Sequence, residues 1–489
     1  MESTTSDKFL KGISTQTIVS LSNGVLQIVV FAIFSRLLSK ADFGYYAALM
    51  GITMIFLGIS DAGIGSAVIQ QKSLTEKYCS TAFTLNLIIG SLIGLLFFII
   101  APALSEMILD STLTVPMRWM SVSLILHSIN GYGVSMLRRD LLFGKVGVFK
   151  LISYTVSAVI AIIYAVNGGG VYSMVMLFVL DAIIYTLLLF SFVRIPKLAI
   201  GCKEAKSVVS FGGWLTLGVI MSTISNQIDK LVLGKWLSVV RLGAYNRPSG
   251  FISNIIGQIN TIFDTVLFPI LSGFQDSKEQ FRRILYSSFG LLTTMGTMLA
   301  LMLFFNSRLI IHIFFGNEWI DLVPILQISS LSAIFMLNNT LADCFYRSFN
   351  LVKIGFFIRT GGIILTLLLI SVGARYDVLG VALSILLSNF VVVICKFIFL
   401  CYISHANFGQ LIAILLKSWK PSIPLLLMGL VLLLLPQSIF SEIFSALILS
   451  GLCLLLLIRF PGFVGEEYMA LIFPKLEILI AKVSNVRKK

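Results

Sequence analysis

The sequence has 489 residues, of which 57% are hydrophobic and only 12% are charged. Soluble domains carry about 25% charged residues, so this composition excludes an ordinary soluble protein. The net charge of +14 comes from basic residues scattered over many short polar intervals, which argues against the single basic module typical of a nucleic-acid-binding protein.

Apolar segments follow one another along almost the whole chain. A helix needs about 20 apolar residues to cross roughly 30 Å of hydrocarbon, and these segments are long enough to do so. We therefore predict an all-α polytopic membrane protein with about 14 transmembrane helices. The predicted spans are residues 15–38, 43–70, 79–104, 113–137, 147–167, 171–193, 210–236, 243–272, 284–305, 322–345, 355–374, 378–403, 413–434 and 439–458.

The distribution of Lys and Arg predicts the topology. If both termini and the intervals after even-numbered spans lie on one side, most of the 36 Lys and Arg gather there. By the positive-inside rule that side is the cytoplasm, so both termini are predicted to be cytoplasmic. The polar start MESTTSDKFLKG has no signal-peptide core, so we expect no segment to be removed.

An internal repeat divides the chain. Gly44, Gly51 and Gly58 reappear 199 residues later as Gly243, Gly250 and Gly257, and further matches follow at an offset of 208. Six spans repeat as six spans, and an even number of crossings returns the chain to the same side. We therefore predict two parallel six-helix bundles related by a pseudo-two-fold axis along the membrane normal. The later matches pair Val115, Pro116, Asn130, Arg139, Lys145, Gly147 and Phe149 with Val323, Pro324, Asn338, Arg347, Lys353, Gly355 and Phe357.

The repeat predicts four parts of the chain. Residues 1–200 form the N-terminal bundle and residues 201–405 the C-terminal bundle. Residues 406–460 form two additional C-terminal helices, and residues 461–489 form a cytoplasmic tail. Residues 306–321, which are longer than their counterpart 105–112, account for the change of offset.

The repeated glycines allow two interpretations. Glycines seven apart lie on one helix face, where small residues let a neighbouring backbone approach closely. They also give a helix the freedom to bend or slide. Close packing and a hinge therefore both remain open for Gly44, Gly51, Gly58, Gly243, Gly250 and Gly257.

Polar side chains within the spans predict a hydrated interior. Arg247, Asn254 and Gln258 follow helical spacing along span 243–272 and form one polar stripe on an apolar helix. Polar side chains in membrane spans normally face a cavity or a partner, although interhelical hydrogen bonds are the structural alternative. The predicted substrate-binding residues of a central cavity are Arg247, Asn254, Gln258, Asn260, Asn23, Gln27 and Asn226.

Several acids within the spans are candidates for ion coupling, because burial favours the protonated carboxyl group. They are Asp61, Asp181, Asp229 and Asp264, and the sequence does not choose among them. Asp181 appears as a lone acid deep in its span. Lys396 and Arg359 are expected to extend their charged ends toward the membrane interface.

No enzyme active site or cofactor site is expected. The six cysteines lack paired spacing, and His127, His312 and His405 are isolated from one another, so no disulfide framework or metal site is predicted. We find no phosphate-binding loop and no catalytic constellation. Transport would therefore use an ion gradient, a membrane potential or the gradient of the substrate.

Four segments carry a resemblance to a known family. They are SRLLSKADFGYYA at 35–47, SDAGIGSAVIQQK at 60–72, VLFPILSGFQDSKEQFRR at 266–283 and FFGNEWIDLVPILQ at 314–327. With its fourteen predicted spans, the chain resembles the Wzx-type polysaccharide flippases. These form the polysaccharide transporter family of the multidrug/oligosaccharidyl-lipid/polysaccharide exporter superfamily, and the colanic acid flippase subgroup is the most similar in pattern.

The resemblance implies a flippase that moves an undecaprenyl-pyrophosphate-linked oligosaccharide from the cytoplasmic to the periplasmic leaflet of a bacterial inner membrane. It implies alternating access, coupling to H+ or Na+, contact with membrane lipids, and a role in exopolysaccharide, O-antigen or lipopolysaccharide synthesis beside polymerase and chain-length proteins. In this interpretation Arg247 meets the pyrophosphate. The alternatives are a multidrug or cation antiporter of the same superfamily, or a membrane polysaccharide polymerase or ligase.

Overall fold

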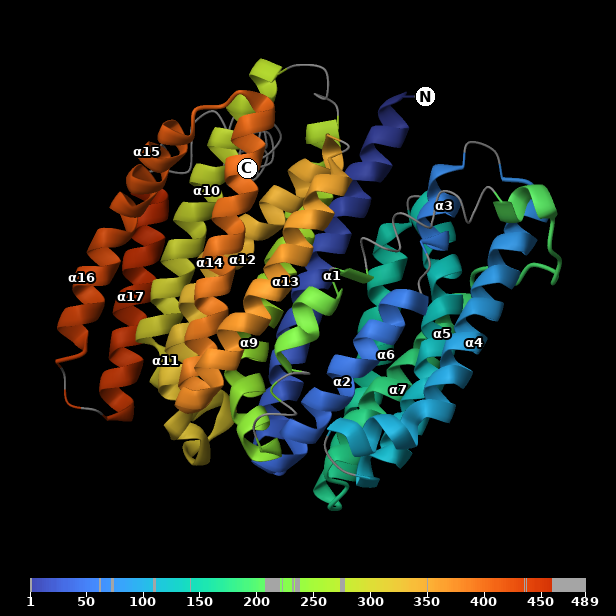
Figure 1. The fold of residues 1–489 in the computed structure, drawn as a ribbon, viewed down its shortest axis with the longest axis horizontal. Coiled ribbons are helices and arrows are strands. Elements are labelled where there is room, and N and C mark those ends of the chain that lie inside the picture. The colour runs from blue at the N-terminus through green and yellow to red at the C-terminus, as the bar shows by residue number, and fades with distance from the viewer. Residues whose placement is uncertain are drawn as a thin grey trace, which may run out of the picture. The chain divides into compact units, whose positions relative to one another are not determined.

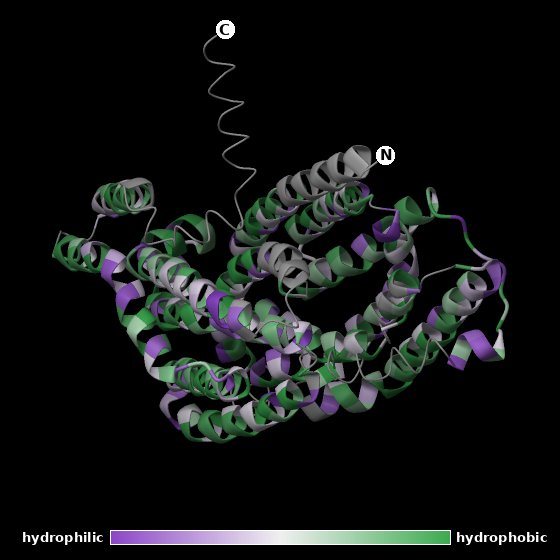
Figure 2. Ribbon diagram, turned by 90° about the horizontal axis from the view of Figure 1, so that it is seen from above, coloured by the Kyte–Doolittle hydropathy of each residue, from purple (hydrophilic) through white to green (hydrophobic). Residues whose placement is uncertain are grey.

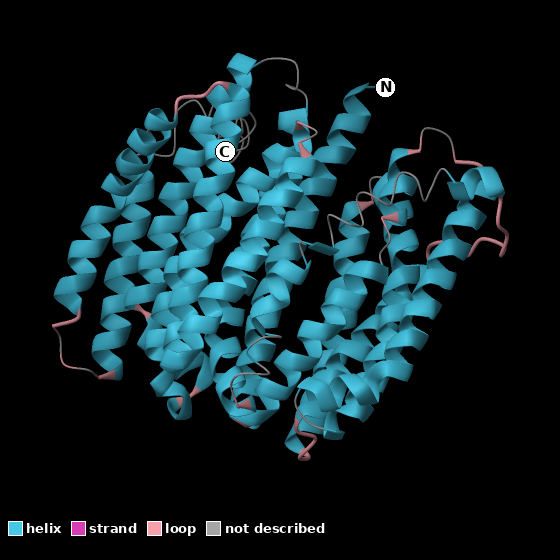
Figure 3. Cartoon of the chain, viewed as in Figure 1, coloured by secondary structure: helices cyan, strands magenta, loops and turns pink. Residues whose placement is uncertain are grey.

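The computed structural model describes residues 2–60, 63–71, 74–108, 111–140, 142–206, 220–221, 223–230, 233, 238–272, 278–349, 351–434, 436 and 438–459. These residues form helices joined by short connections, and no strand occurs among them (Figure 3). Ten helical segments within them are long and apolar enough to cross a membrane. Figure 2 shows that most turns of these helices are hydrophobic. The all-α polytopic fold is therefore confirmed.

Contacts between residues divide the chain into two compact units. The first holds residues Met1–Arg247 and Arg359–Val381, and the second holds Pro248–Ile358 and Ala382–Lys489. The boundaries fall within three helices, α9 (Val239–Ser272), α13 (Val352–Gly373) and α14 (Asp377–Ser404), and not between residues 200 and 201. The four-part division expected from the repeat remains a prediction.

In the first unit, α4 packs on α5, α6 packs on α7, and α1 packs on α6. Leu49, Phe97, Met120 and Val175 belong to a buried cluster that joins α2, α4, α5 and α7. The helices of this unit, apart from its parts of α9, α13 and α14, are α1 (Glu2–Leu37), α2 (Lys40–Ser60), α3 (Ile64–Gln70), α4 (Glu76–Ile108), η1 (Ser111–Leu113), α5 (Thr114–Arg139), α6 (Phe143–Val166), α7 (Val171–Phe190) and η4 (Ala374–Tyr376) (Figure 1).

In the second unit, α10 packs on α12, α15 and α16, and α16 packs on α17. Leu285, Phe289, Phe345 and Phe397 belong to one of its buried clusters. The helices of this unit, apart from its parts of α9, α13 and α14, are α10 (Lys278–Phe305), α11 (Ser307–Ile310), the π-helix η2 (Ile311–Phe315), η3 (Asn317–Leu322), α12 (Val323–Ser348), α15 (Phe408–Trp419), η5 (Lys420–Ser422), α16 (Ile423–Leu432) and α17 (Ile439–Arg459).

Two predicted spans are interrupted by residues that cannot continue a helix. Within predicted span 43–70, α2 ends at Ser60 and α3 begins at Ile64, after Gly63 with a φ of 63°, a left-handed conformation that favours glycine. Within predicted span 413–434, α15 ends before Pro421, which lacks the N–H that a helix interior requires. Predicted span 210–236 lies mostly outside the described residues.

The repeat-related helices α2 and α9 approach each other backbone to backbone within the first unit. A Cβ atom on Gly44 would lie 1.9 Å from the carbonyl oxygen of Val239, and one on Gly243 would lie 2.1 Å from that of Lys40. Lys40 and Val239 occupy equivalent positions in the repeat, as do the two glycines. The contact is therefore self-complementary, as expected around a two-fold axis.

A second pair of equivalent positions anchors the first turns of α2 and α9. The Asp42 carboxylate accepts hydrogen bonds from Ser39 Oγ at 2.6 Å and from the backbone N–H of Val171 at 3.0 Å, at the start of α7. At the equivalent position in α9, Arg241 Nη1 lies 3.2 Å from Asp377 Oδ1 at the start of α14. In both repeats the start of one helix thus contacts the start of another at equivalent positions. The contact is a hydrogen bond between α2 and α7 in the first repeat and a salt bridge between α9 and α14 in the second.

We expect Asp42→Ala to lower the free energy of unfolding by about 1 kcal/mol, since loss of a helix-capping carboxylate typically costs that much. Asp42→Asn should be milder, because the amide oxygen can still accept the hydrogen bond from Val171. Thermal unfolding of the detergent-purified variants measures the difference. Equal midpoints for Asp42→Ala and the unmodified protein would contradict this role.

Candidate functional site

Arg247 lies fully buried in the first unit, among α1, α2 and the first turns of α9. Its side chain has 0% exposure. The guanidinium carbon is 3.3 Å from the centroid of the Phe43 ring and 4.7 Å from that of Phe31. Stacking of a cation on aromatic faces is worth about 0.5–2 kcal/mol. The rings thus provide an electrostatically favourable environment for this charge.

The polar stripe on α9 becomes more exposed beyond Arg247. Asn254 is exposed, and Gln258 and Asn260 are half-buried. These three residues belong to the second unit, whereas Arg247, Asn23, Gln27 and Asn226 belong to the first. A single cavity lined by both sets remains a prediction.

The candidate acids differ in how much of their surroundings is described. Asp61 lies outside the described residues, as does the side chain of Asp264. Asp229, in helical segment 223–230, accepts a hydrogen bond from the Tyr245 hydroxyl at 2.8 Å. The neighbouring Lys230 donates a hydrogen bond to Gln227 Oε1 at 2.9 Å.

Asp181 is paired, so the expectation of a lone acid is wrong. Its carboxylate forms a salt bridge with Lys150 of α6 and accepts a hydrogen bond from Ser153 Oγ at 2.7 Å. Asp181 is almost fully buried, whereas 37% of the Lys150 side chain is exposed. Asp181 also interacts electrostatically with Tyr46 of α2, His127 of α5 and Tyr154 of α6. The structure therefore gathers ionisable groups from three other helices, α2, α5 and α6, around this carboxylate of α7.

The second unit contains another Lys–Asp pair, in which the lysine is buried, and which the sequence did not indicate. Lys396 of α14 donates hydrogen bonds to Asp343 and, at 2.6 Å, to Asn339 Oδ1 of α12. Only 1% of the Lys396 side chain is exposed, so the expectation that it reaches the interface is wrong. The Tyr346 hydroxyl donates a hydrogen bond to the Lys396 carbonyl at 2.8 Å. This pair joins α12 and α14.

We expect Asp343→Asn to destabilise the protein by roughly 3 kcal/mol, because removal of one partner leaves the buried Lys396 ammonium without its carboxylate. The double variant Asp343→Leu/Lys396→Met should recover much of that loss, since it removes both charges. Thermal unfolding of the single and double variants tests this account. A double variant less stable than Asp343→Asn would show that the pair is not the source of the loss.

The repeated glycines fall into two groups. Gly44 and Gly243 lie in the close contact described above, Gly51 is buried, and a Cβ on Gly58 would lie 3.0 Å from Thr223 Oγ1. Cβ atoms on Gly250 and Gly257 would have no described atom within 4 Å. A Cβ would therefore meet a close neighbour at Gly44, Gly58 and Gly243, while close packing and a hinge both remain predictions for the set of six.

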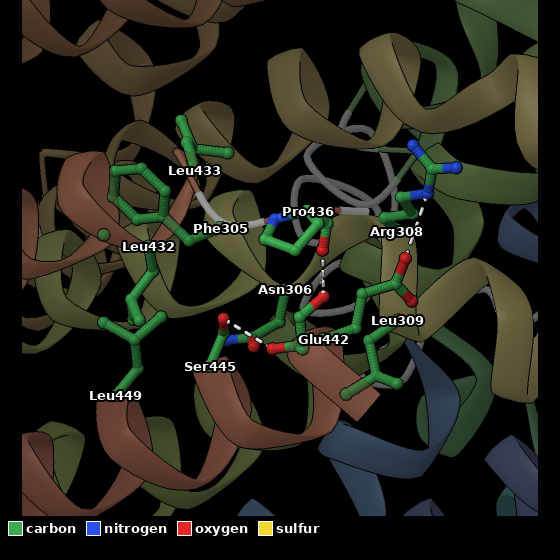
Figure 4. A pocket seen from close by; sticks show the side chains of 12 residues that line it. Phe305, Asn306, Arg308, Leu309, Leu432, Leu433, Pro436, Glu442, Ser445 and Leu449 are labelled. Carbon is green, nitrogen blue, oxygen red and sulfur yellow. Dashed lines mark hydrogen bonds and ion pairs between the residues drawn. The ribbon is translucent and has the colours of Figure 1, made fainter. Parts of the chain in front are cut away.

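A small pocket lies in the second unit, where the end of α10 and α11 meet the hairpin of α16 and α17 (Figure 4). Its volume is about 80 Å³. Glu442 lies between two basic side chains, with Oε1 3.0 Å from Arg308 Nε and Oε2 2.8 Å from His312 Nδ1. Leu432, Leu433 and Leu449 line its apolar side. The carboxylate of Glu442 thus links α17 to α11 and the π-helix η2.

No metal site is found in the described part of the chain, where no three or more His, Cys, Asp or Glu side chains converge. The histidines also differ from one another in their surroundings. His127 stacks on Phe178 with ring centroids 5.6 Å apart, and His312 contacts Glu442 as described above.

Comparison with known proteins identifies relatives and a common fold. The family model described as polysaccharide biosynthesis protein matches residues 33–324. The lipopolysaccharide biosynthesis protein WzxC of Escherichia coli is 22% identical over 64% of this chain and 63% of its own length. The succinoglycan biosynthesis transport protein ExoT of Rhizobium meliloti is 24% identical over 63% of this chain and 62% of its own length. These matches therefore span less than two thirds of each relative.

A third relative and two solved structures extend the comparison. The teichuronic acid biosynthesis protein TuaB of Bacillus subtilis is 22% identical over 67% of this chain and 68% of its own length. The lipid II flippase MurJ in an inward closed conformation has a TM-score of 0.72 and 16% identity, over 93% of this chain and 99% of its own. An inward-facing multidrug resistance transporter of the MATE family has a TM-score of 0.64 and 12% identity, over 80% of this chain and 98% of its own. At these identities, both structures establish similarity of fold only.

Proposed function

This chain belongs to the polysaccharide biosynthesis protein family, and we propose that it is a Wzx-type flippase for lipid-linked oligosaccharides. The match of the family model to residues 33–324 carries the proposal. The names of the relatives, which refer to lipopolysaccharide, teichuronic acid and succinoglycan, point to the same class of substrate. The fold shared with a lipid II flippase supports the same type of movement.

The proposed substrate is an oligosaccharide repeat unit carried on undecaprenyl pyrophosphate. It moves by alternating access from the cytoplasmic to the periplasmic leaflet of a bacterial inner membrane, with both termini of the protein in the cytoplasm. The product enters exopolysaccharide or O-antigen synthesis, and polymerase and chain-length proteins are proposed partners. As a transporter, the protein needs no catalytic residue.

Arg247 is the proposed contact for the pyrophosphate. Hydrogen bonds between a guanidinium group and phosphate oxygens are stronger than stacking on aromatic rings, so the substrate can compete with Phe43 and Phe31 for this cation. The sugar is proposed to bind the amide side chains of Asn254, Gln258, Asn260, Asn23, Gln27 and Asn226, which supply both donors and acceptors.

Coupling to H+ or Na+ is proposed to involve one of the buried acids Asp61, Asp181, Asp229 and Asp264. Among these four acids, the surroundings of Asp181 are described most fully. In the proposed cycle, a proton or a sodium ion takes the place of the partly exposed Lys150 beside this carboxylate. One charge that crosses a potential of 100 mV supplies about 2.3 kcal/mol, which is enough to favour one direction of transport.

Reconstitution into proteoliposomes tests this function against its alternatives. We expect transfer of a lipid-linked oligosaccharide between leaflets, changed in rate by a pH or sodium gradient. We also expect no uptake of a cationic drug and no lengthening of the sugar. Drug uptake without lipid transfer would support an antiporter, and elongated sugar would support a polymerase or ligase. Either result would overturn the proposal.

A further inference from the structure

An extended segment follows α7 on the first unit. Residues 193–201, named the strap here, have no helical structure and lie against the start of α4. The backbone N–H of Ala199 donates to Thr84 Oγ1 at 3.1 Å, and that of Gly201 donates to Thr81 Oγ1 at 3.0 Å. Two threonines one helical turn apart thus fix one end of the strap to α4.

The exposed side chains of the strap are of two kinds. Ile195, Leu198 and Ile200 are each more than half exposed. Arg194 and Lys197 alternate with them and are also exposed. The strap therefore combines exposed apolar side chains with positive charge.

Positive charge continues around the strap. Residues 192–206 contain the basic residues Arg194, Lys197, Lys203 and Lys206 and a single acid, Glu204. Lys145 lies beside the strap, with Nζ 4.2 Å from the centroid of the Phe192 ring. Glu204 lies 3.9 Å from Lys77. The surface as a whole is therefore basic.

The strap backbone and its side chains favour different surroundings. Within residues 194–200, the described part of the chain provides a hydrogen-bond acceptor for one backbone N–H, that of Ala199. Unpaired N–H groups are strongly disfavoured in hydrocarbon, whereas the exposed isoleucine and leucine side chains are disfavoured in water. The backbone N–H groups can contact water while the apolar side chains contact lipid only at the boundary between the lipid headgroups and the acyl chains.

We propose that the strap binds anionic phospholipid at this boundary. Ile195, Leu198 and Ile200 insert among the acyl chains, while Arg194 and Lys197 of the strap and the neighbouring Lys203 contact phosphate groups. Arg194 can donate two parallel hydrogen bonds to one phosphate. Each Lys or Arg near an anionic membrane surface contributes about a fivefold preference. The proposal concerns the surrounding lipid and does not depend on the identity of the transported substrate.

Quenching of tryptophan by brominated lipid tests the proposal in the full-length protein. Leu198→Trp places a reporter on the strap, and fluorescence of the unmodified protein is subtracted because the chain contains five tryptophans. Brominated phosphatidylglycerol should quench this reporter with at least about fivefold higher apparent affinity than brominated phosphatidylcholine. In the matched control Ile163→Trp, on an exposed apolar position of α6, the two lipids should quench equally.

The triple substitution Arg194→Gln/Lys197→Gln/Lys203→Gln in the Leu198→Trp background should bring the two affinities together. Raising ionic strength from about 0.02 M to about 0.5 M should do the same without any change to the basic residues, since salt screens exposed charges. This second measurement decides the question if the triple variant fails to insert. Equal quenching by both lipids at low salt, or a preference that neither treatment reduces, would overturn the proposal.

Discussion

Gly44→Ala and Gly243→Ala are each expected to destabilise the protein by about 3 kcal/mol. In both variants the new methyl group would meet a backbone carbonyl oxygen, at 1.9 Å for Gly44 and 2.1 Å for Gly243. A flexible side chain could move aside, but a helix backbone moves only with the helix. Thermal unfolding of the detergent-purified variants measures the loss.

Gly250→Ala is the matched control, because a Cβ at this position has no described atom within 4 Å. Alanine favours a helix over glycine by about 1 kcal/mol, so this variant should be as stable as the unmodified protein or more so. The double variant Gly44→Ala/Gly243→Ala should lose less than the sum of the single losses, since one separation of α2 from α9 relieves both clashes. Tolerance of alanine at both positions would contradict the close approach of the two helices.

Arg247→Met is expected to reduce transport about 10- to 100-fold and to leave the stability nearly unchanged. A charge-assisted hydrogen bond to a phosphate group is worth about 1.5–3 kcal/mol. Methionine occupies a similar volume between Phe31 and Phe43 without a charge to bury. Initial rates of lipid transfer in proteoliposomes, at equal amounts of inserted protein, measure the effect.

Arg241→Gln provides the matched control for Arg247→Met, because it also removes one arginine from α9. Arg241 and its partner Asp377 are more than half exposed, and such surface pairs contribute about 0–1 kcal/mol. Transport by Arg241→Gln should therefore stay within about twofold of the unmodified protein. Unchanged transport in Arg247→Met would remove Arg247 from the proposed site.

The sequence predicted the helical fold because membrane spans leave a direct signal in hydropathy. Breaks within spans were harder to place, since Gly63 and Pro421 lie inside segments that were predicted as single spans, 43–70 and 413–434. Both residues interrupt a helix for reasons of backbone geometry, which a hydropathy pattern does not record.

The repeat identified Gly44 and Gly243 as equivalent, but not as neighbours. Equivalent residues meet only if they lie near the symmetry axis, and the sequence contains no information about that distance. The structure supplies it through the paired contacts of Gly44 with Val239 and of Gly243 with Lys40.

The partners of buried charges could not be found from sequence. Lys150 and Asp181 lie on different helices, as do Asp343 and Lys396, so helical spacing gives no indication of either pair. Hydropathy does not show which face of a helix points toward the partner, because a membrane helix is apolar on the face toward lipid and on much of the face toward protein. For the same reason the sequence grouped Arg247 and Asn254 in one stripe, although one is buried and the other exposed.

Transfer of a lipid-linked sugar across the bilayer can be measured from the accessibility of the sugar. Lipid-linked oligosaccharide is distributed over both leaflets of proteoliposomes that contain only this protein, and a membrane-impermeant reagent modifies the sugars exposed outside. We expect the protected inner pool to become modified at a rate proportional to the protein content. An inner pool that stays protected, as in protein-free vesicles, would contradict it.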